Sequence, residues 1–217
     1  MKKYEFDIVQ FAIDSFFPKE RVKNKIQLIE ILLEATRYML VYPNIEKHDT
    51  KGKFTLVVDK MSRLFFEKDD KFISFVFPFY VSQIGDELNF TFQNIDVDSR
   101  LISNVISTIR CDSFKNQCSL DFADSMYDFE SEQEDFWVFL RELILLEDGY
   151  IRYDKDTEGY NQAKERGEEH RHPVNHYDLY YSSNASFKIG LENEIELKEF
   201  IDLLDTKTDC KYLKKWR

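Results

Sequence analysis

The hydrophobic positions near the start of the chain follow the spacing of a helix. After Pro18 they recur at alternating intervals of four and three residues, at Val22, Ile26, Ile29, Leu33, Thr36 and Leu40. A second stripe widens this face, at Leu28, Leu32, Ala35 and Met39. This pattern predicts a core helix packed on both flanks. Because the residue before a proline avoids helical geometry, we expect the helix to end before Pro43 and residues 1–48 to form a helical part.

From about residue 54 the pattern changes to that of strands. Four segments are rich in β-branched and aromatic residues, namely FTLVV, RLFFE, KFISFVFPFYV and ELNFTF. Gly85 and Asp86 lie between the last two segments and predict a hairpin turn. Pro78 lies inside the longest segment and cannot donate a ladder hydrogen bond. We therefore expect it at a sheet edge or a bulge, where a covering loop or a partner's strand would lie.

Two further helices are predicted in the middle of the chain. The first begins near Asp98 or Ser99 and has one apolar face, made of Leu101, Ile102, Val105, Ile106 and Ile109. The second begins at a capping-box sequence, Ser131 with Glu134. Its expected buried face is Phe136, Phe139, Leu140, Leu143 and Ile144. The acidic segment between them, LDFADSMYDFESEQED, lacks the pattern of a calcium-binding loop, so we interpret it as a solvated loop.

The last third of the chain alternates strands with charged segments. YIRYD predicts a strand, residues 155–170 a charged loop, and HYDLYY and SFKIGL two more strands. A final helix is expected with Asn193 as N-cap and Glu196 at its third position. Its expected buried face is Leu197, Phe200, Ile201 and Leu204. The whole pattern predicts an α+β fold with one domain over residues 1–217, in which N-terminal, central and C-terminal helices pack on a mainly antiparallel sheet within residues 49–217.

Composition narrows the protein's setting. With 217 residues, of which 43% are hydrophobic, the chain can bury a full-sized core. Its cysteines, Cys111, Cys118 and Cys210, are odd in number and form no C-x-x-C pair, which favours a reducing compartment. Acidic residues interrupt any signal-peptide core, and the apolar runs are shorter than a membrane span. We therefore expect a cytoplasmic protein without a membrane partner.

The net charge of −11 disfavours binding to a phosphate backbone. The exception is the basic C-terminal tail KYLKKWR, in which Trp216 lies beside Lys211, Lys214, Lys215 and Arg217. Such a tail can contact phosphates and stack on a base, or it can be a solvated terminus. Nucleic acid is therefore an unexpected partner except through this tail.

Three of the four histidines, His170, His172 and His176, lie in the segment EEHRHPVNHYDLYY. Alternate side chains of a strand share a face, so Asp178 is expected beside His176. The same parity places Arg152 with Asp154 on YIRYD and puts Lys188 on the polar side of its strand. If these strands are neighbours, the five side chains converge on one sheet face, with His170 and His172 held above it by the turn at Pro173.

Three chemistries can use such a set of side chains. A divalent metal site takes imidazoles and a carboxylate, which His170, His172, His176 and Asp178 supply, although their spacing matches no strong zinc signature. Metal-free acid–base catalysis uses a histidine oriented by Asp154 or Asp178, with Arg152 or Lys188 holding an anion. A restriction-type nuclease core places a carboxylate two residues before a catalytic lysine, but Ser186 has that place before Lys188.

A purely structural role for the same residues also stays open. His172 can hydrogen-bond the incoming loop, His176 can begin the strand, and Asp154 can pair with Arg152 or cap the turn. The candidate catalytic set is therefore Arg152, Asp154, His172, His176, Asp178 and Lys188. The sequence contains no nucleophile elbow, Walker A motif or dinucleotide-binding glycine motif.

The segment IRYD, followed by HPVNH, an FKIGL strand and a closing helix, resembles a bacterial family of unknown function. That family has an Arg-aromatic-Asp strand, then a His-Pro-x-x-x-His segment or a near variant, and occurs in mobile-element or phage-defence settings. The resemblance covers about the last third of the chain. The matching residues are Arg152, Asp154, His172, Pro173 and His176. It implies where a site lies and leaves its chemistry open.

Two functions remain as expectations. The acidic composition, the aromatic-rich sheet and the lack of a specific catalytic motif favour a cytoplasmic accessory protein that binds another protein. The resemblance implies that such a protein acts in a phage-defence or mobile-element module. The alternative is a hydrolase or nuclease centred on His172 and His176, with or without a divalent metal.

Overall fold

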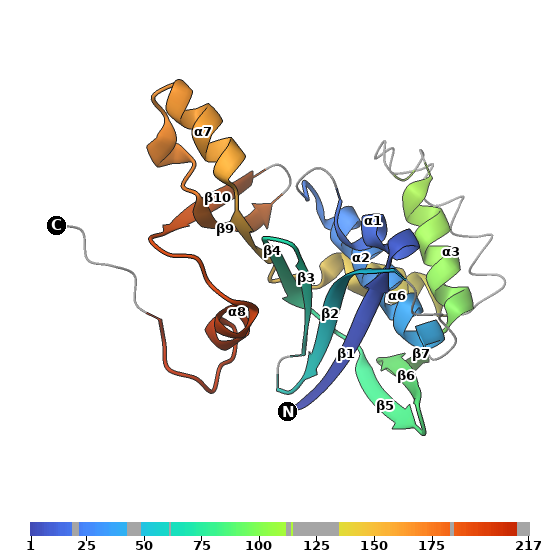
Figure 1. Ribbon diagram of the computed structural model, residues 1–217. Helices are drawn as coiled ribbons and strands as arrows, with labels where there is room; N and C mark the ends of the chain where they lie inside the picture. Colours follow the sequence, from blue (N-terminus) through green and yellow to red (C-terminus); the bar gives the residue numbers. More distant parts are fainter. Residues whose placement is uncertain are drawn as a thin grey trace.

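The main feature of the fold is an antiparallel sheet. The computed structural model describes residues 1–18, 22–42, 49–60, 62–111, 114, 135–182 and 185–211. Within these residues the main sheet has seven strands in the order β1-β2-β3-β4-β8-β9-β10, and every neighbouring pair is antiparallel (Figure 1). Its strands are β1 (Lys2–Val9), β2 (Thr50–Val58), β3 (Arg63–Lys68), β4 (Lys71–Val76), β8 (Ile151–Lys155), β9 (Asn175–Ser182) and β10 (Ala185–Leu191).

A small second sheet and several helices complete the fold. The second sheet is formed by β5 (Tyr80–Ile84), β6 (Glu87–Phe92) and β7 (Ile95–Asp96). The α-helices are α1 (Ile13–Phe16), α2 (Lys25–Val41), α3 (Ser99–Arg110), α6 (Phe136–Leu145), α7 (Thr157–Glu165) and α8 (Leu197–Leu203). The short 3₁₀ turns among the described residues are η1 (Gln10–Ala12) and η3 (Glu169–Arg171). The predicted α+β class and the mainly antiparallel sheet are confirmed.

The core lies on both faces of the main sheet. The larger cluster fills the space between one face and α1, α2, α3 and α6, and it includes Phe54, Leu56 and Phe66. The smaller cluster lies on the opposite face under α8 and includes Phe65, Tyr153 and Phe200. Because side chains alternate along a strand, β2 and β3 supply residues to both clusters. Figure 1 shows α8 on one side of these strands and α2 on the other.

The helical N-terminal part expected over residues 1–48 is wrong for residues 2–9. These form β1, in which Phe6 and Ile8 are buried at alternate positions and the strand pairs with β2. The helix α2 begins at Lys25 because Asn24 caps it, accepting a hydrogen bond from the amide of Gln27. It ends at Val41, and Pro43 lies outside the described residues.

The segment KFISFVFPFYV is two strands rather than one. It divides at Pro78, with β4 in the main sheet and β5 in the small one, so Pro78 lies at neither an edge nor a bulge. Phe77 and Phe79 on its two sides are both buried, with ring centroids 5.1 Å apart. The predicted hairpin turn is confirmed, because Ile84 pairs with Glu87 around Gly85, whose φ is +62°.

The central helices agree with the sequence pattern where they are described. α3 begins after Asp98, whose side chain accepts a hydrogen bond from the amide of Leu101. Four of the five residues expected on the apolar face of α6 are buried, namely Phe136, Phe139, Leu140 and Leu143. The capping box at Ser131 and Glu134 and most of the acidic segment lie outside the described residues.

Two C-terminal expectations are corrected. The charged loop predicted over residues 155–170 contains α7, capped by the Asp156 side chain; Ala163 is its one buried residue, so it has no apolar stripe in the sequence. The N-cap of α8 is Glu196 rather than Asn193, and Glu196 forms a capping box with Glu199. Phe200 is fully buried, as its position in the predicted face requires.

No helix in the part of the chain that the structure describes is long and apolar enough to cross a membrane.

Candidate functional site

The site is built by three neighbouring antiparallel strands. In the register of β8 and β9, Arg152 lies opposite Asp178 and Asp154 lies opposite His176. In the register of β9 and β10, Lys188 lies opposite Asp178. The parity of each strand puts all five side chains on the same sheet face, as the sequence analysis expected for neighbouring strands. We call these five residues the β8–β10 cluster.

Arg152 joins the two carboxylates of the cluster. Its Nε donates to Oδ2 of Asp154 at 2.6 Å, and its Nη2 donates to Oδ2 of Asp178, also at 2.6 Å. Lys188 approaches from β10, with its Nζ 3.5 Å from Oδ1 of Asp178. The cluster thus contains two carboxylates and two cations, which balance in charge. Such pairing is what permits ionic groups to be buried at a sheet face.

His176 is held in one tautomer. Its Nδ1 lies 2.8 Å from the carbonyl oxygen of Pro173, and since a carbonyl can only accept, Nδ1 carries the proton. Nε2 is then unprotonated, and it accepts a hydrogen bond from Nζ of Lys188 at 2.6 Å. Burial, and secondarily the charge of Lys188, lower the pKa of His176, so the ring is neutral near pH 7.

Gly190 is a residue that the sequence analysis missed. It lies opposite His176 in the register, and a Cβ at this position would lie 2.8 Å from Cγ of Pro173. A side chain at residue 190 would therefore push away the proline whose carbonyl orients His176. The local sequence holds no sign of this role, because the contact joins two segments that are apart in the chain.

The carboxylate of Asp154 has one oxygen without a partner. Asp154 is 3% exposed, and among the described residues no group hydrogen-bonds its Oδ1. Nε2 of His176 lies 3.8 Å from Oδ2 of Asp154 and 3.9 Å from Oδ2 of Asp178. One donor atom from each of these three residues falls within 4.8 Å of the others, and no second such group occurs in the described ranges. The three residues can therefore surround a cation.

The structure does not bring His170 and His172 into this group, which corrects the metal set of His170, His172, His176 and Asp178. His170 lies in η3 and is exposed. Nε2 of His172 lies 2.9 Å from Oδ2 of Asp156, the residue that caps α7. The ring of His172 also contacts that of His176, with centroids 5.0 Å apart. His172 thus ties η3 to the start of α7, and Asp154 is the ligand-type neighbour of His176.

A surface pocket reaches the cluster through Arg152. Its volume is about 470 Å³, and it lies between the end of α1, the hairpin that joins β3 to β4, and the start of β8. Its charged lining residues are four basic ones, Lys68, Lys71, Arg152 and Lys155, and three acidic ones, Asp14, Asp69 and Asp70. Tyr150 also lines it, and burial raises the pKa of this phenol to about 12. Tyr150 alternates with Arg152 and Asp154 in the segment YIRYD. The sequence pattern therefore already indicates that these three side chains face the same way.

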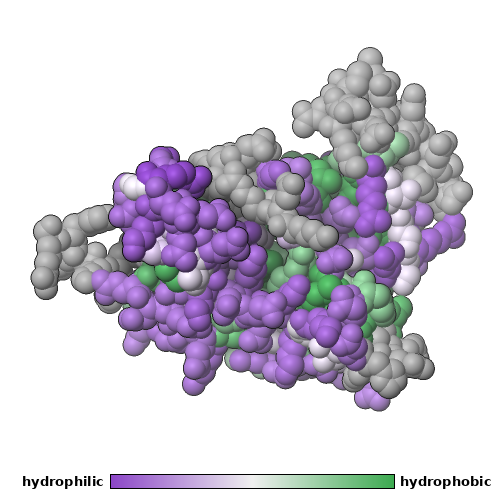
Figure 2. Space-filling view, turned by 45° about the horizontal axis from the view of Figure 1, so that its top comes forward, coloured by the Kyte–Doolittle hydropathy of each residue, from purple (hydrophilic) through white to green (hydrophobic). Residues whose placement is uncertain are grey.

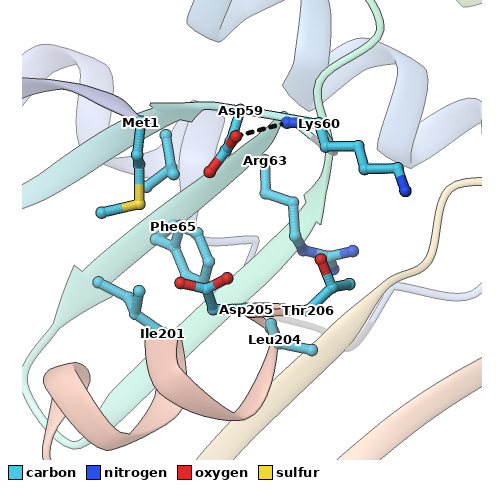
Figure 3. A pocket seen from close by; sticks show the side chains of 10 residues that line it. Met1, Asp59, Lys60, Arg63, Phe65, Ile201, Leu204, Asp205 and Thr206 are labelled. Atoms are coloured by element: carbon cyan, nitrogen blue, oxygen red, sulfur yellow. Dashed lines mark hydrogen bonds between the residues drawn. The ribbon is translucent and has the colours of Figure 1, made fainter. Parts of the chain in front are cut away.

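A smaller pocket lies on the opposite side of the sheet, between β2, β3 and α8 (Figure 3). Its volume is about 30 Å³, room for one water molecule. Arg63 points toward it and is buried, which lowers its pKa to about 10. Its Nε donates to Oγ of Ser74 at 3.0 Å and its Nη2 to the carbonyl oxygen of Gly149 at 2.5 Å. These bonds give Arg63 a structural role between β3 and β8.

Most of the basic C-terminal tail lies outside the described residues. Residues 212–217, with Lys214, Lys215, Trp216 and Arg217, lie outside the described residues. Lys211 is described, and it pairs with Asp202 of α8 at 2.5 Å. A nucleic-acid contact through the tail stays a prediction.

Comparisons of this chain with protein-family models, with curated proteins and with solved structures give no match. The resemblance to a bacterial family therefore stays a prediction. The geometry of the β8–β10 cluster is therefore the observation that bears on the function of this protein.

Proposed function

We propose that this protein is a hydrolase, that the β8–β10 cluster is its active site, and that its substrate is an anion such as a phosphoester. One observation carries the proposal: two carboxylates, a neutral imidazole and two cations from three strands meet at a buried sheet face. Burying such groups costs free energy, and apolar residues would stabilise the same place at least as well. Groups of this kind therefore cluster preferentially at functional sites.

The cluster has groups suited to each part of a hydrolytic reaction. Arg152 lines the pocket and also belongs to the cluster, so its guanidinium can bind an anionic oxygen that enters the pocket. Asp154 and Asp178 can accept a proton from an attacking water molecule. Lys188 is close enough to Asp178 to stabilise negative charge that develops beside it.

The structure also changes the argument about a nuclease. A restriction-type core needs a carboxylate beside its lysine, and the sequence has Ser186 two residues before Lys188. Asp178 lies directly opposite Lys188 on the neighbouring strand and supplies a carboxylate there. The serine therefore counts less against phosphodiester cleavage than it does in the sequence alone.

The proposal predicts that activity depends on Asp154 and not on His172. Purified protein is assayed on p-nitrophenyl phosphate, bis-p-nitrophenyl phosphate, and single- and double-stranded DNA and RNA, with added Mg²⁺, Mn²⁺ or Zn²⁺ and with chelator. Asp154→Asn and Asp178→Asn should each lower kcat/KM by about 100-fold or more, the usual contribution of a positioned acid or base. His172→Gln, which changes a neighbouring histidine outside the cluster, is the control and should retain activity.

Equal rates for wild type and Asp154→Asn would contradict this proposal. So would a wild-type protein that hydrolyses none of these substrates under any of the metal conditions. Melting temperatures of the variants separate a loss of chemistry from a loss of folded protein.

A second candidate function is protein–protein interaction, as an accessory protein of the cytoplasm in a phage-defence or mobile-element module. One observation favours it. Among the described residues β5 pairs only with β6, so its other edge is open, and its Tyr80 and Ile84 are 72% and 74% exposed. Strand edges of this kind pair with other chains unless charges or prolines block them.

A further inference from the structure

We infer that the β8–β10 cluster binds one divalent cation through His176, Asp154 and Asp178, and that the ammonium group of Lys188 holds this place when the metal is absent. This inference deepens the proposed function. The catalytic role of the metal rests on that function, whereas the binding of the metal rests on the geometry of the cluster alone.

The spacing of the three groups suits a single ion. Two ligand atoms that are each about 2.1 Å from a metal can be no more than about 4.2 Å apart. Nε2 of His176 is 3.8 Å and 3.9 Å from the Oδ2 atoms of Asp154 and Asp178. One donor atom of each residue lies within 4.8 Å of the other two, so small side-chain movements bring the three atoms to ligand distance of a common point.

The unpartnered oxygen of Asp154 is independent support. This residue is almost fully buried, and its Oδ1 has no hydrogen-bond partner in the part of the chain that the structure describes. Leaving a buried acceptor unsatisfied costs about 1–3 kcal/mol. Arg152 binds Oδ2 of both carboxylates, and Oδ1 of Asp178 faces Nζ of Lys188 at 3.5 Å, so Oδ1 of Asp154 is the oxygen left for another partner among the described residues. A cation bound by both oxygens of the Asp154 carboxylate would satisfy this oxygen.

His176 has the orientation of a metal-ligating histidine. Such residues usually donate their second ring N–H to a carbonyl or a carboxylate, which fixes the tautomer and aims the other nitrogen at the metal. Here the carbonyl of Pro173 receives Nδ1–H, and Nε2 faces the carboxylates. The proline can approach this closely because residue 190 is a glycine.

Lys188 is the group that a metal must displace. Its Nζ contacts Nε2 of His176 at 2.6 Å and lies 3.5 Å from Oδ1 of Asp178, two of the atoms that a cation would bind. Its side chain is 30% exposed, so the ammonium group can move into solvent without crossing the core. One imidazole and two carboxylates suit Mn²⁺, Fe²⁺ or Zn²⁺ better than Ca²⁺, which prefers a shell of oxygens.

The test is calorimetric titration of chelator-treated protein with Mn²⁺ and, separately, with Zn²⁺. Wild type should bind one ion. Lys188→Ala should bind it roughly tenfold more tightly, because no cation has to leave the site and no like charge remains beside it. Asp154→Asn should bind it roughly tenfold more weakly or worse, because it loses a charged ligand.

Two variants serve as matched controls. Asp156→Asn changes a nearby carboxylate outside the cluster and keeps a residue that can cap α7. Lys155→Ala removes a nearby lysine that pairs with Glu194 at 2.8 Å instead of with the cluster. Both should bind metal as wild type does.

Tighter binding by Lys188→Ala together with weaker binding by Asp154→Asn would support the inference. Absence of binding in both wild type and Lys188→Ala would overturn it, as would equal affinity of these two proteins. If Asp154→Asn does not fold, Lys188→Ala decides alone, because its side chain is partly exposed and its removal leaves no buried cavity. Metal binding without hydrolysis would reject the proposed function and keep this inference, whereas hydrolysis in chelator without metal binding would do the reverse.

Discussion

At the residue scale, polar side chains in this protein hold segments together that are distant in the chain. His172 links the turn before β9 to the cap of α7, and Arg63 links β3 to Gly149, two residues before β8. Tyr38 of α2 does the same for β1: its hydroxyl donates to the carbonyl oxygen of Asp7 at 2.6 Å and accepts from the amide of Val9 at 3.3 Å. The bonds of Arg63 and Tyr38 satisfy backbone groups, whereas the bond of His172 joins two side chains.

We predict that Tyr38→Phe lowers the free energy of unfolding by about 1–2 kcal/mol, because it leaves a carbonyl and an amide of β1 without their partner. Burial raises the pKa of this phenol above its ordinary value of 10.0. The unfolded chain therefore loses the proton first as pH rises above 10, and the advantage of wild type over Tyr38→Phe should shrink there. Urea unfolding of both proteins at about pH 8 and about pH 10.5 measures the difference.

The difference between the two proteins isolates Tyr38, because every other titrating group is common to both. A stability difference that stays constant or grows above pH 10 would show that the pKa of the phenol is not raised by folding. No difference at neutral pH would show that solvent replaces both hydrogen bonds.

At the element scale, β5 has an open edge among the described elements and carries two exposed large hydrophobic side chains, Tyr80 and Ile84. Ile84 and Glu87 flank a two-residue turn, so they form a hydrogen-bonded pair. Ladder alternation then directs the backbone groups of Val81 and Gln83 to the free edge. An antiparallel second copy centred on Ser82 would pair these two residues and place Tyr80 against Ile84 of the other copy. β5 carries no charge that would oppose this pairing.

We predict that the protein self-associates weakly through this edge and that Ile84→Lys raises the dissociation constant of the dimer by about tenfold, because charged residues block edge pairing. Sedimentation velocity over a range of concentrations measures the constant. Leu145→Lys is the matched control, since Leu145 is 69% exposed and is the last residue of a helix, α6, and not part of a strand.

A wild-type protein that stays monomeric at every concentration would contradict this prediction. An equal effect of the two lysine substitutions would assign the association to general surface hydrophobicity instead of to β5. Either result would also remove the observation that favours the interaction function.

At the scale of the whole molecule, one sheet carries both core clusters. β2 and β3 place Phe54, Leu56 and Phe66 in the larger cluster and Val57 and Phe65 in the smaller one. The face shown in Figure 2 is largely hydrophilic, with smaller hydrophobic areas, as expected for a chain with a net charge of −11. Because the two clusters share β2 and β3, loss of one cluster destabilises the strands that support the other.

We predict a single cooperative unfolding transition, the behaviour of one domain. Trp137 of α6 packs against the larger cluster, so in a Trp216→Phe protein its fluorescence reports that side of the sheet. Its urea transition should coincide with that of the far-ultraviolet circular dichroism, which reports all elements. Phe200→Ala, which removes a fully buried ring under α8, should shift both curves together. Separate midpoints for the two signals would divide the chain into two folding units.

The amino-acid sequence by itself determined the local features of this protein. The helices α2 and α3, most of the strands and the Gly85 turn follow from periodicity and capping, which act over a few residues. The shared parity of Arg152 with Asp154, and of His176 with Asp178, is equally local, because alternate side chains of any strand face the same way. The α+β class follows from the order of these elements.

The tertiary structure alone decided which local features meet. β4 and β8 are neighbours although more than 70 residues separate them, and this pairing is what brings β8, β9 and β10 into the main sheet. The sequence pattern also missed two local features. The apolar run around Pro78 continues without interruption from β4 into β5, and α7 has no apolar periodicity. Most importantly, the candidate ligand group joins His176 to Asp154 from another strand and not to the histidines next to it in sequence. Strand register and pairing depend on contacts between distant segments, which spacing along the chain does not encode.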